Sequence, residues 1–230
     1  MLRISIISTF EYKMNKLLFA FLILFTYTTH TTAISPNKGT FALTEKAGKL
    51  SKSKELYNDC GLQGFISLHA FENAMSGYEK YGTSKPILAI CDFSKPSSQE
   101  RFFIIDLKNK KLLKKSLVAH GKNSGGLMAT SFSNQPESLK SSLGFFLIGT
   151  TIQTAKHGLA LLLEGLEKGV NDNARKREII IHGADYVSEK FVQQYGYLGK
   201  SWGCPALPND VIKEFAPVLK DGALLCISTE

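Results

Sequence analysis

A series of short apolar runs, rich in β-branched and aromatic residues, follows Pro86 and constrains the fold more than any other feature of the sequence. Runs of this length that lie between turn residues are typical of β-strands. They predict strands at Ile87–Phe93, Arg101–Leu107, Leu112–His120, Gly144–Gly149, Leu159–Glu164, Ile179–His182 and Ala223–Ser228. The segment Lys108-Asn109-Lys110 joins the second and third of these runs as a hairpin.

Only short helices fit between the strands, at about Val187–Tyr195 and Asn209–Phe215, and Pro217 is expected to end or bend the second one. Many strands with few helices indicate a mostly β fold, either a sandwich or an open barrel, rather than a parallel α/β sheet. With 230 residues, of which 43% are apolar, the chain is long enough for one sizeable core.

The beginning of the chain resembles a secretory signal peptide. Met14-Asn15-Lys16 gives a positive start, Leu17–Phe25 is apolar, and Thr31-Thr32-Ala33 forms a small-residue exit. The apolar run is too short to serve as a lasting membrane anchor. We therefore predict a signal peptide at residues 1–33 and export to the periplasm or another extracytoplasmic space. An N-terminal buried helix is the alternative.

A helical signal separates this leader from the strands. Leu68, Phe71, Met75 and Tyr78 form one apolar stripe at helical spacing, and Ser67 is a candidate N-cap. We assign residues 34–85 to a linker and an N-terminal helical subdomain, and residues 86–230 to the strand-rich domain.

The charge balance limits the classes of partner. The predicted leader holds three basic residues and one acidic residue, so its removal lowers the formal net charge from +8 to about +6. A basic surface suits a polyanionic cell wall or a membrane surface, and export argues against nucleic acid. None of the histidines has zinc-ligand spacing with another, so we expect neither a metal nor a cofactor.

The apolar run Ile179–His182 ends in a histidine that is followed directly by Gly183. Cys204 lies further along the chain, between Gly203 and Pro205. A nucleophilic thiol needs an imidazole to accept its proton and backbone amides to receive an oxyanion. Spacing alone leaves open a structural role for the cysteine, which is often a buried residue.

The order of the two residues removes several classes of enzyme. Papain-like peptidases place the cysteine before the histidine. Sortases have the order seen here, but they need an arginine after the cysteine, and no arginine follows Cys204.

The pattern His182-Gly183 followed by Ser201-x-Gly203-Cys204 resembles the signature of YkuD-type L,D-transpeptidases. Ser201–Ala206 is similar to the branch called the murein L,D-transpeptidase catalytic-domain family. The resemblance extends from about Ile87 to Ile227 and includes Ile90–Ser98, His120–Gly126 and Ser131–Asn134. The chain departs from the commoner signature at Trp202, where that signature has histidine, and at Ala206, where it has a polar residue or arginine.

The resemblance implies a β-rich catalytic domain and an exported L,D-transpeptidase that cross-links peptidoglycan stem peptides through a thioester. It implies Cys204 as nucleophile, His182 as base, and the carbonyl of Gly183 as the group that orients the imidazole. Amides of Gly203 and Cys204 are expected to bind the oxyanion. Two alternatives stay open: a carboxypeptidase or endopeptidase that hydrolyses stem peptides, and a cell-wall-binding protein that is not an enzyme.

Further residues are assigned to the substrate side of the site. By resemblance, we expect the polar segment with His120, Lys122, Asn123 and Ser124 to form a wall of the cleft, and its composition argues against a place in the core. The signature places Ser201 there too, and Trp202 is predicted as an exposed aromatic wall. His157 is interpreted as lying either in solvent or on the rim of the site.

The remaining cysteines allow two arrangements. If Cys204 is the nucleophile, Cys60, Cys91 and Cys226 remain. Either a Cys60–Cys91 disulfide forms or all three are buried free thiols.

Overall fold

Eight strands form a single sheet in the computed structural model, which describes residue 48 and residues 52–229. The strands are β1 (Ile87–Asp92), β2 (Phe102–Asp106), β3 (Lys111–Ser116), β4 (Gly144–Thr154), β5 (Gly158–Gly165), β6 (Ile180–Gly183), β7 (Ala206–Leu207) and β8 (Leu224–Ser228). The helices are α2 (Leu68–Tyr81), α3 (Glu189–Tyr195) and α4 (Asn209–Leu219), with a short 3₁₀ turn η1 (Lys122–Ser124). The predicted signal peptide at residues 1–33 lies outside the described residues.

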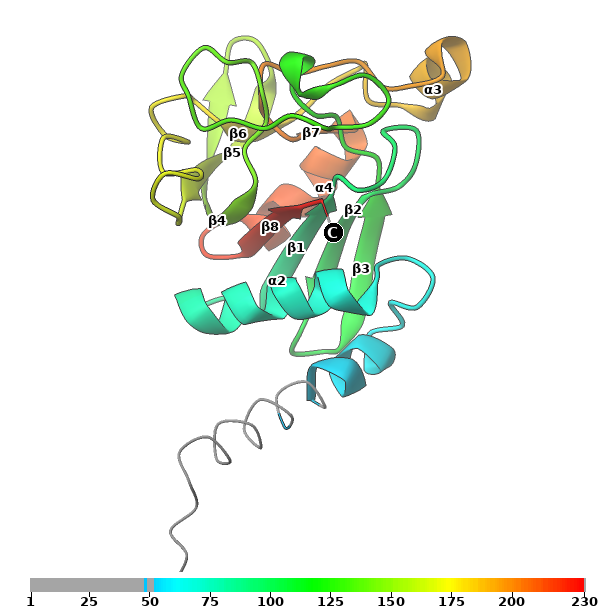
Figure 1. The fold of residues 1–230 in the computed structure, drawn as a ribbon, viewed down its shortest axis with the longest axis vertical. Coiled ribbons are helices and arrows are strands. Elements are labelled where there is room, and N and C mark those ends of the chain that lie inside the picture. The colour runs from blue at the N-terminus through cyan, green and yellow to red at the C-terminus, as the bar shows by residue number, and fades with distance from the viewer. Residues whose placement is uncertain (1–47, 49–51, 230) are drawn as a thin grey trace, which may run out of the picture.

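The sheet has the order β3-β2-β1-β8-β4-β5-β6-β7 and is antiparallel except for two pairs, β1 with β8 and β6 with β7. Its two edges approach each other, because Ala119, just beyond β3, forms a bridge with Ala206 of β7. The ribbon in Figure 1 shows this curl. The predicted mostly β fold with few short helices is therefore confirmed.

Several boundaries differ from the prediction. Strand β3 ends at Ser116 rather than His120, β4 continues to Thr154, and β7 was not predicted because two residues carry no periodicity. Pro217 does not end α4, which runs to Leu219. The proline removes one backbone donor near the end of a helix whose buried face is already packed, so the final turn persists.

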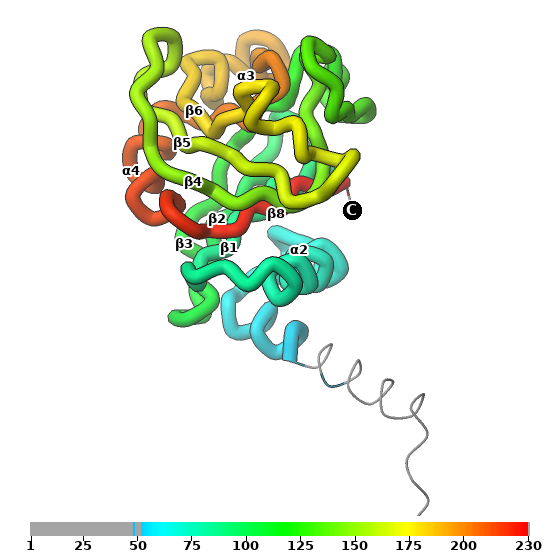
Figure 2. Tube along the Cα trace, turned by 90° about the vertical axis from the view of Figure 1, so that its left-hand side faces the viewer, coloured from blue at the N-terminus to red at the C-terminus, as the bar shows by residue number. Residues whose placement is uncertain are grey.

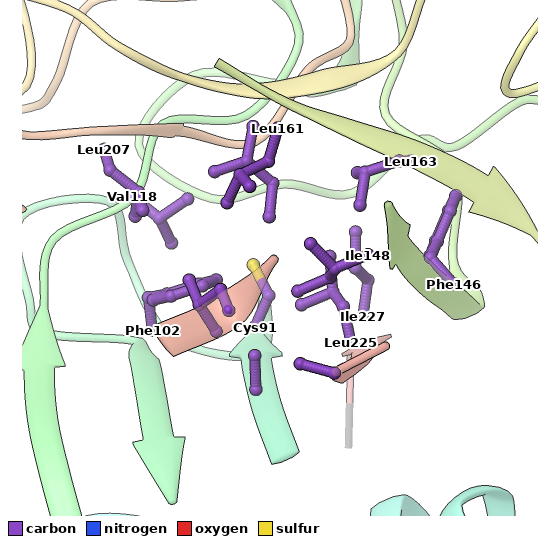
Figure 3. Packing of buried hydrophobic residues seen from close by; sticks show 14 of the residues in the cluster. Cys91, Phe102, Val118, Phe146, Ile148, Leu161, Leu163, Leu207, Leu225 and Ile227 are labelled. Atoms are coloured by element: carbon purple, nitrogen blue, oxygen red, sulfur yellow. The ribbon is translucent and has the colours of Figure 1, made fainter. Parts of the chain in front are cut away.

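The two faces of the sheet carry separate cores. Helix α4 contacts β1, β5 and β6 on one face, over the cluster drawn in Figure 3. Helix α2 contacts β1 and β8 on the other face, as Figure 2 shows. The expected stripe of α2 packs there, and Ser67 caps the helix by accepting a hydrogen bond from the amide of Ala70 at 3.0 Å.

All four cysteines are free thiols. Cys91 belongs to the core beneath α4, whereas Cys60 and Cys226 belong to the core beneath α2. The sheet therefore separates Cys60 from Cys91, and the arrangement with buried free thiols is the one the structure shows.

No helix among residues 52–229 has both the length and the apolar character that a membrane span requires.

The loop between β5 and β6 is fixed by one buried amide. Asn171 donates to the carbonyls of Leu143 and Phe145, each at 3.0 Å, and accepts from the amide of Glu167 at 2.9 Å. A Cβ at Gly165 would lie 1.9 Å from the carbonyl oxygen of Asn171. The absence of a side chain at position 165 thus allows this loop to pack against the end of β5.

We expect Gly165→Ala to lower the free energy of unfolding by about 1–3 kcal/mol, because the new methyl group meets backbone that cannot rotate away. Gly149→Ala is the matched control in the neighbouring strand, since its nearest neighbour would be Leu162 Cβ at 3.4 Å, an ordinary contact. Urea titration measures both variants. Equal effects would contradict the role assigned to Gly165.

Candidate active site

A cavity of about 950 Å³ opens beside the edge of the sheet formed by β5, β6 and β7. His182 and Cys204 both line it. The other walls come from the tip of the β4–β5 hairpin, from residues 175–180 and from the turn 200–204.

The pairing of β6 with β7 brings the two predicted reactive residues to this cavity. His182 lies opposite Ala206 in the parallel ladder. Cys204 is two residues before Ala206, so it lies just ahead of the position that faces the histidine. Gly183 packs tightly against α4, because a Cβ there would lie 2.3 Å from Asn209 Oδ1. Helix α4 therefore packs directly against strand β6 at Gly183, the residue that follows the histidine.

The imidazole of His182 is almost completely buried, and a hydrogen bond to the backbone fixes which ring nitrogen carries the proton. Its Nδ1 lies 2.9 Å from the carbonyl oxygen of Gly183. A carbonyl only accepts hydrogen bonds, so Nδ1 carries the proton and Nε2 keeps a free lone pair. Burial lowers the pKa of His182 to about 4, with smaller contributions from the charges of His157 and Lys156. A neutral imidazole of this kind is suited to accept a proton.

A second histidine stacks on the first. The rings of His157 and His182 are 3.8 Å apart at their centroids and inclined by 30°. The β4–β5 hairpin places His157 there, since β5 pairs with β6 through Ala160 and His182. The hairpin turn is held by a hydrogen bond of 2.9 Å from the amide of His157 to Thr154 Oγ1. His157 is thus at the rim of the site, which resolves the two interpretations of its position.

The turn that carries Cys204 is braced by Ser201. The hydroxyl of Ser201 donates to the carbonyl of Cys204 at 2.6 Å and accepts from the amide of Gly203 at 3.1 Å. Gly203 adopts φ +125°, a conformation that favours glycine. In this structure the amide of Gly203 therefore donates to Ser201, and its expected role in binding an oxyanion stays a prediction. The amide of Cys204 lies near its own sulfur and helps to lower the pKa of the thiol.

Burial raises the pKa of the Cys204 thiol above its ordinary value. Hydrogen bonding from the backbone of Ile180, the charge of Arg177 and the charge of Lys156 oppose this effect in part. With a raised thiol pKa and a lowered imidazole pKa, the resting pair is a neutral thiol and a neutral imidazole.

Arg177 is a residue of the site that the sequence analysis did not identify. Its guanidinium donates to the carbonyls of Ser133 at 2.7 Å and Lys140 at 2.6 Å and to the hydroxyl of Ser142 at 2.5 Å. It also lies close to Gly203, where a Cβ would be 3.2 Å from Nη2. Arg177 therefore holds the loop of residues 133–142 against the turn that carries Cys204. The only signal in the sequence is its place in a basic stretch ahead of β6.

The polar segment from His120 to Ser124 does not lie where the sequence predicted. His120 and Ser124 are fully buried, Lys122 and Asn123 are exposed, and none of the four lines the cavity. The backbone of the segment instead supports the nucleophile turn: the amide of Ser201 donates to the carbonyl of His120 at 3.1 Å, and the amide of Lys122 donates to Ser201 at 2.8 Å. These contacts satisfy the polar groups, which is why a polar segment can be buried.

A chain of basic side chains explains the burial of His120. Arg101, also fully buried, donates from Nη2 to His120 Nδ1 at 2.8 Å and to the carbonyl of Val118 at 2.8 Å. Lys200 Nζ lies 3.0 Å from His120 Nε2 on the cavity side. Burial, together with the charges of Arg101 and Lys200, lowers the pKa of His120 to about 3. The ring is therefore neutral and serves as an acceptor for Arg101.

Among the residues that the structure describes, Trp202 is the most exposed large apolar side chain, at 67%, and it borders the cavity. The ammonium group of Lys156 sits over its ring, 3.8 Å from the centroid. The structure thus places Trp202 at the surface, as the sequence predicted. Ala206 is buried and contributes no polar group to the cavity.

Among residues 48 and 52–229, no cluster of histidine, cysteine, aspartate and glutamate has the composition of a metal site.

The neutral resting pair predicts the pH dependence of alkylation. Iodoacetamide reacts with the thiolate, and below the raised pKa of Cys204 the thiolate fraction grows about tenfold for each pH unit. We expect the rate of Cys204 alkylation to rise in this way between about pH 7 and 8, measured by mass spectrometry against a Cys204→Ala control. A rate that stays flat from pH 5 to 8 would show a preformed ion pair instead.

We expect Arg177→Gln to slow alkylation of Cys204 several-fold at pH 7 and to lower the melting temperature, because it removes both a positive charge and the hydrogen bonds to the loop. Arg177→Lys keeps the charge, so it should lose stability but retain more of the reactivity. The exposed neighbour Arg175 supplies the control, Arg175→Gln. If the lysine and glutamine variants lose equal reactivity, the charge of Arg177 has no part in it.

Comparison with known proteins gives a match to one protein family. A family model described as L,D-transpeptidase catalytic domain matches residues 63–227. No match was found among curated proteins.

Solved structures similar to this chain include an L,D-transpeptidase from Mycobacterium smegmatis (14% identity, 62% of this chain and 58% of that chain, TM-score 0.39). Others are the helical cell shape determining protein of Campylobacter jejuni (16%, 64% and 49%, TM-score 0.42) and an L,D-transpeptidase of Enterococcus faecium (13%, 63% and 50%, TM-score 0.36). The chain spans about half to three-fifths of the length of these three structures. The match of the family model over most of the sequence shows that the chain belongs to the L,D-transpeptidase catalytic domain family.

Proposed function

We propose that the chain is an exported cysteine L,D-transpeptidase that cross-links peptidoglycan stem peptides through a thioester on Cys204. One observation carries the proposal: a buried histidine, with Nδ1 committed to the carbonyl of Gly183, opens onto the same cavity as a partly exposed cysteine. The family supplies the class of substrate, and the predicted leader at residues 1–33 supplies the argument for export.

Acylation starts from the neutral pair. The thiol proton of Cys204 moves to Nε2 of His182 as the sulfur attacks the carbonyl carbon of the donor peptide. The tetrahedral intermediate then collapses: the carbon–nitrogen bond breaks, and His182 returns the proton to the departing amine of the D-amino acid. The products are a thioester on Cys204, a free amino acid and a neutral imidazole.

The second half of the reaction repeats these steps in reverse order. An acceptor amine gives its proton to His182 and attacks the thioester carbon, the carbon–sulfur bond breaks, and the thiolate takes the proton back. The result is a new amide bond and the resting enzyme. Water in place of the amine would give a free carboxylate, which is the hydrolase alternative.

The oxyanion of both intermediates needs donors that are not already used. Because the amide of Gly203 donates to Ser201, the amides of Trp202 and Cys204 are the remaining donors in the turn. Ser201 and the segment from His120 to Lys122 act by holding this turn in place rather than by touching the substrate.

The proposal is tested with purified protein and defined disaccharide tetrapeptides, with products identified by mass. Cross-linked dimers confirm the transpeptidase, and tripeptide monomers alone indicate the hydrolase.

Cys204→Ala should abolish both products with little change in melting temperature, since the side chain sits on a turn at the edge of a cavity. His182→Ala should slow turnover at least about 100-fold while leaving alkylation at high pH largely intact. Full turnover by either variant would contradict the assignment.

A further inference from the structure

The cavity around Cys204 and His182 is strongly basic. Five basic residues line it, and Glu178 is the only acidic one among its lining residues. The basic residues are Lys156, Arg175, Lys176, Arg177 and Lys200. Such a concentration of one sign attracts an anionic ligand.

Most of these cations are already committed or lie away from the reactive pair. Arg177 is held by carbonyl and hydroxyl oxygens of residues 133–142. Lys200 donates to the carbonyl of Gly126. Arg175 and Lys176 are exposed at the rim. Of the five, only Lys156 has an ammonium group without an oxygen partner and lies next to Trp202 and the stacked histidines.

Two contacts define the position of Lys156. Its ammonium group lies over the indole of Trp202, 3.8 Å from the ring centroid, so it connects the hairpin tip to the nucleophile turn. Its neighbour His157 is stacked on His182. Among the described residues Lys156 forms no ion pair, and the ring covers only one side of the ammonium group, which leaves donors for a ligand.

The charge of Lys156 acts on Cys204, on His182 and on His157, which is stacked on His182. Burial is the main cause of the lowered pKa values of His157 and His182, and the charge of Lys156 adds to both. The same charge works against the burial that raises the pKa of Cys204. A ligand anion bound at Lys156 would thus lie close to the carbonyl that Cys204 attacks, and it would ease the formation of an imidazolium at His182.

We propose that Lys156, seated on the ring of Trp202, is a specificity-determining residue that binds a carboxylate of the donor peptide next to the scissile bond. This inference rests on the proposed function. The carboxylate has two possible sources: the terminal carboxylate of the leaving amino acid, or a side-chain carboxylate on the residue that supplies the scissile carbonyl.

The test compares three donor tetrapeptides: one with both carboxylates free, one amidated at the C-terminus and one amidated at the side chain. With the free donor, we expect Lys156→Gln to lower kcat/KM about tenfold, mainly through KM, and Lys156→Arg to restore most of it. With the donor amidated at the recognised carboxylate, wild type and Lys156→Gln should be equally slow. The donor that abolishes the difference identifies the source of the carboxylate.

Lys176→Gln is the matched control, because it removes a lysine from the rim of the same cavity. A loss equal to that of Lys156→Gln would show a general effect of charge and overturn the proposal. A loss that is the same for all three donors would overturn it too, since no carboxylate would then be recognised. If wild type turns over no donor although Cys204 is alkylated by iodoacetamide, the proposed function fails, and this inference fails with it.

Binding is measured separately from chemistry in the Cys204→Ala background. Trp202 is the only tryptophan of the chain, so its fluorescence reports directly on the ring beneath Lys156. We expect the free donor to change the emission and Lys156→Gln to weaken the apparent affinity about tenfold. An emission that ignores the donor, at concentrations that support turnover in the wild type, would remove Trp202 and Lys156 from the donor site.

Discussion

The parallel pairing of β6 with β7 is the contact on which the site depends. It sets His182 opposite Ala206 and thereby brings Cys204 to the same cavity. Both strands are so short that their hydrogen bonds alone could not hold the register. The pairing is clamped from two sides, by α4 packed against Gly183 and by the bridge from Ala119 to Ala206. Curling the sheet until its edges meet is therefore what assembles the reactive pair.

Two guanidinium groups without carboxylate partners, one fully buried and one half-buried, stabilise the loops around this pairing. Among the described residues, Arg101 and Arg177 bind carbonyl oxygens, hydroxyl groups and one imidazole, and neither forms a salt bridge. Hydrogen bonds to neutral acceptors offset part of the free-energy cost of removing the guanidinium groups from water, but they do not neutralise the positive charge. A carboxylate partner would hold the loop of residues 133–142 equally well, but it would neutralise the positive charge of Arg177. The choice of neutral partners lets Arg177 serve both as a brace and as a positive charge near Cys204.

The sequence was informative wherever one local pattern determined the outcome. The apolar runs predicted seven of the eight strands, and the spacing of His182, Ser201 and Cys204 predicted residues that the fold does bring to one region. Contacts between distant segments left no such pattern. Arg177 became part of the site through partners more than thirty residues away, and His120 was buried by Arg101 and Lys200. The polar composition of the segment suggested a place outside the core, because the partners that allow its burial come from other elements.

The neutral state of the pair links the fold to the chemistry. Burial lowers the pKa of His182 to about 4 and raises that of Cys204, so a thiolate does not persist without a carbonyl to attack. A permanent thiolate would be a target for oxidants, whereas a neutral thiol in a partly closed cavity is protected. In the proposed acylation, the energy needed to transfer the proton is supplied when the donor binds and the sulfur–carbon bond begins to form. The cavity around Cys204 and His182 is basic, so it would attract an anionic ligand before any charge has developed on these two side chains.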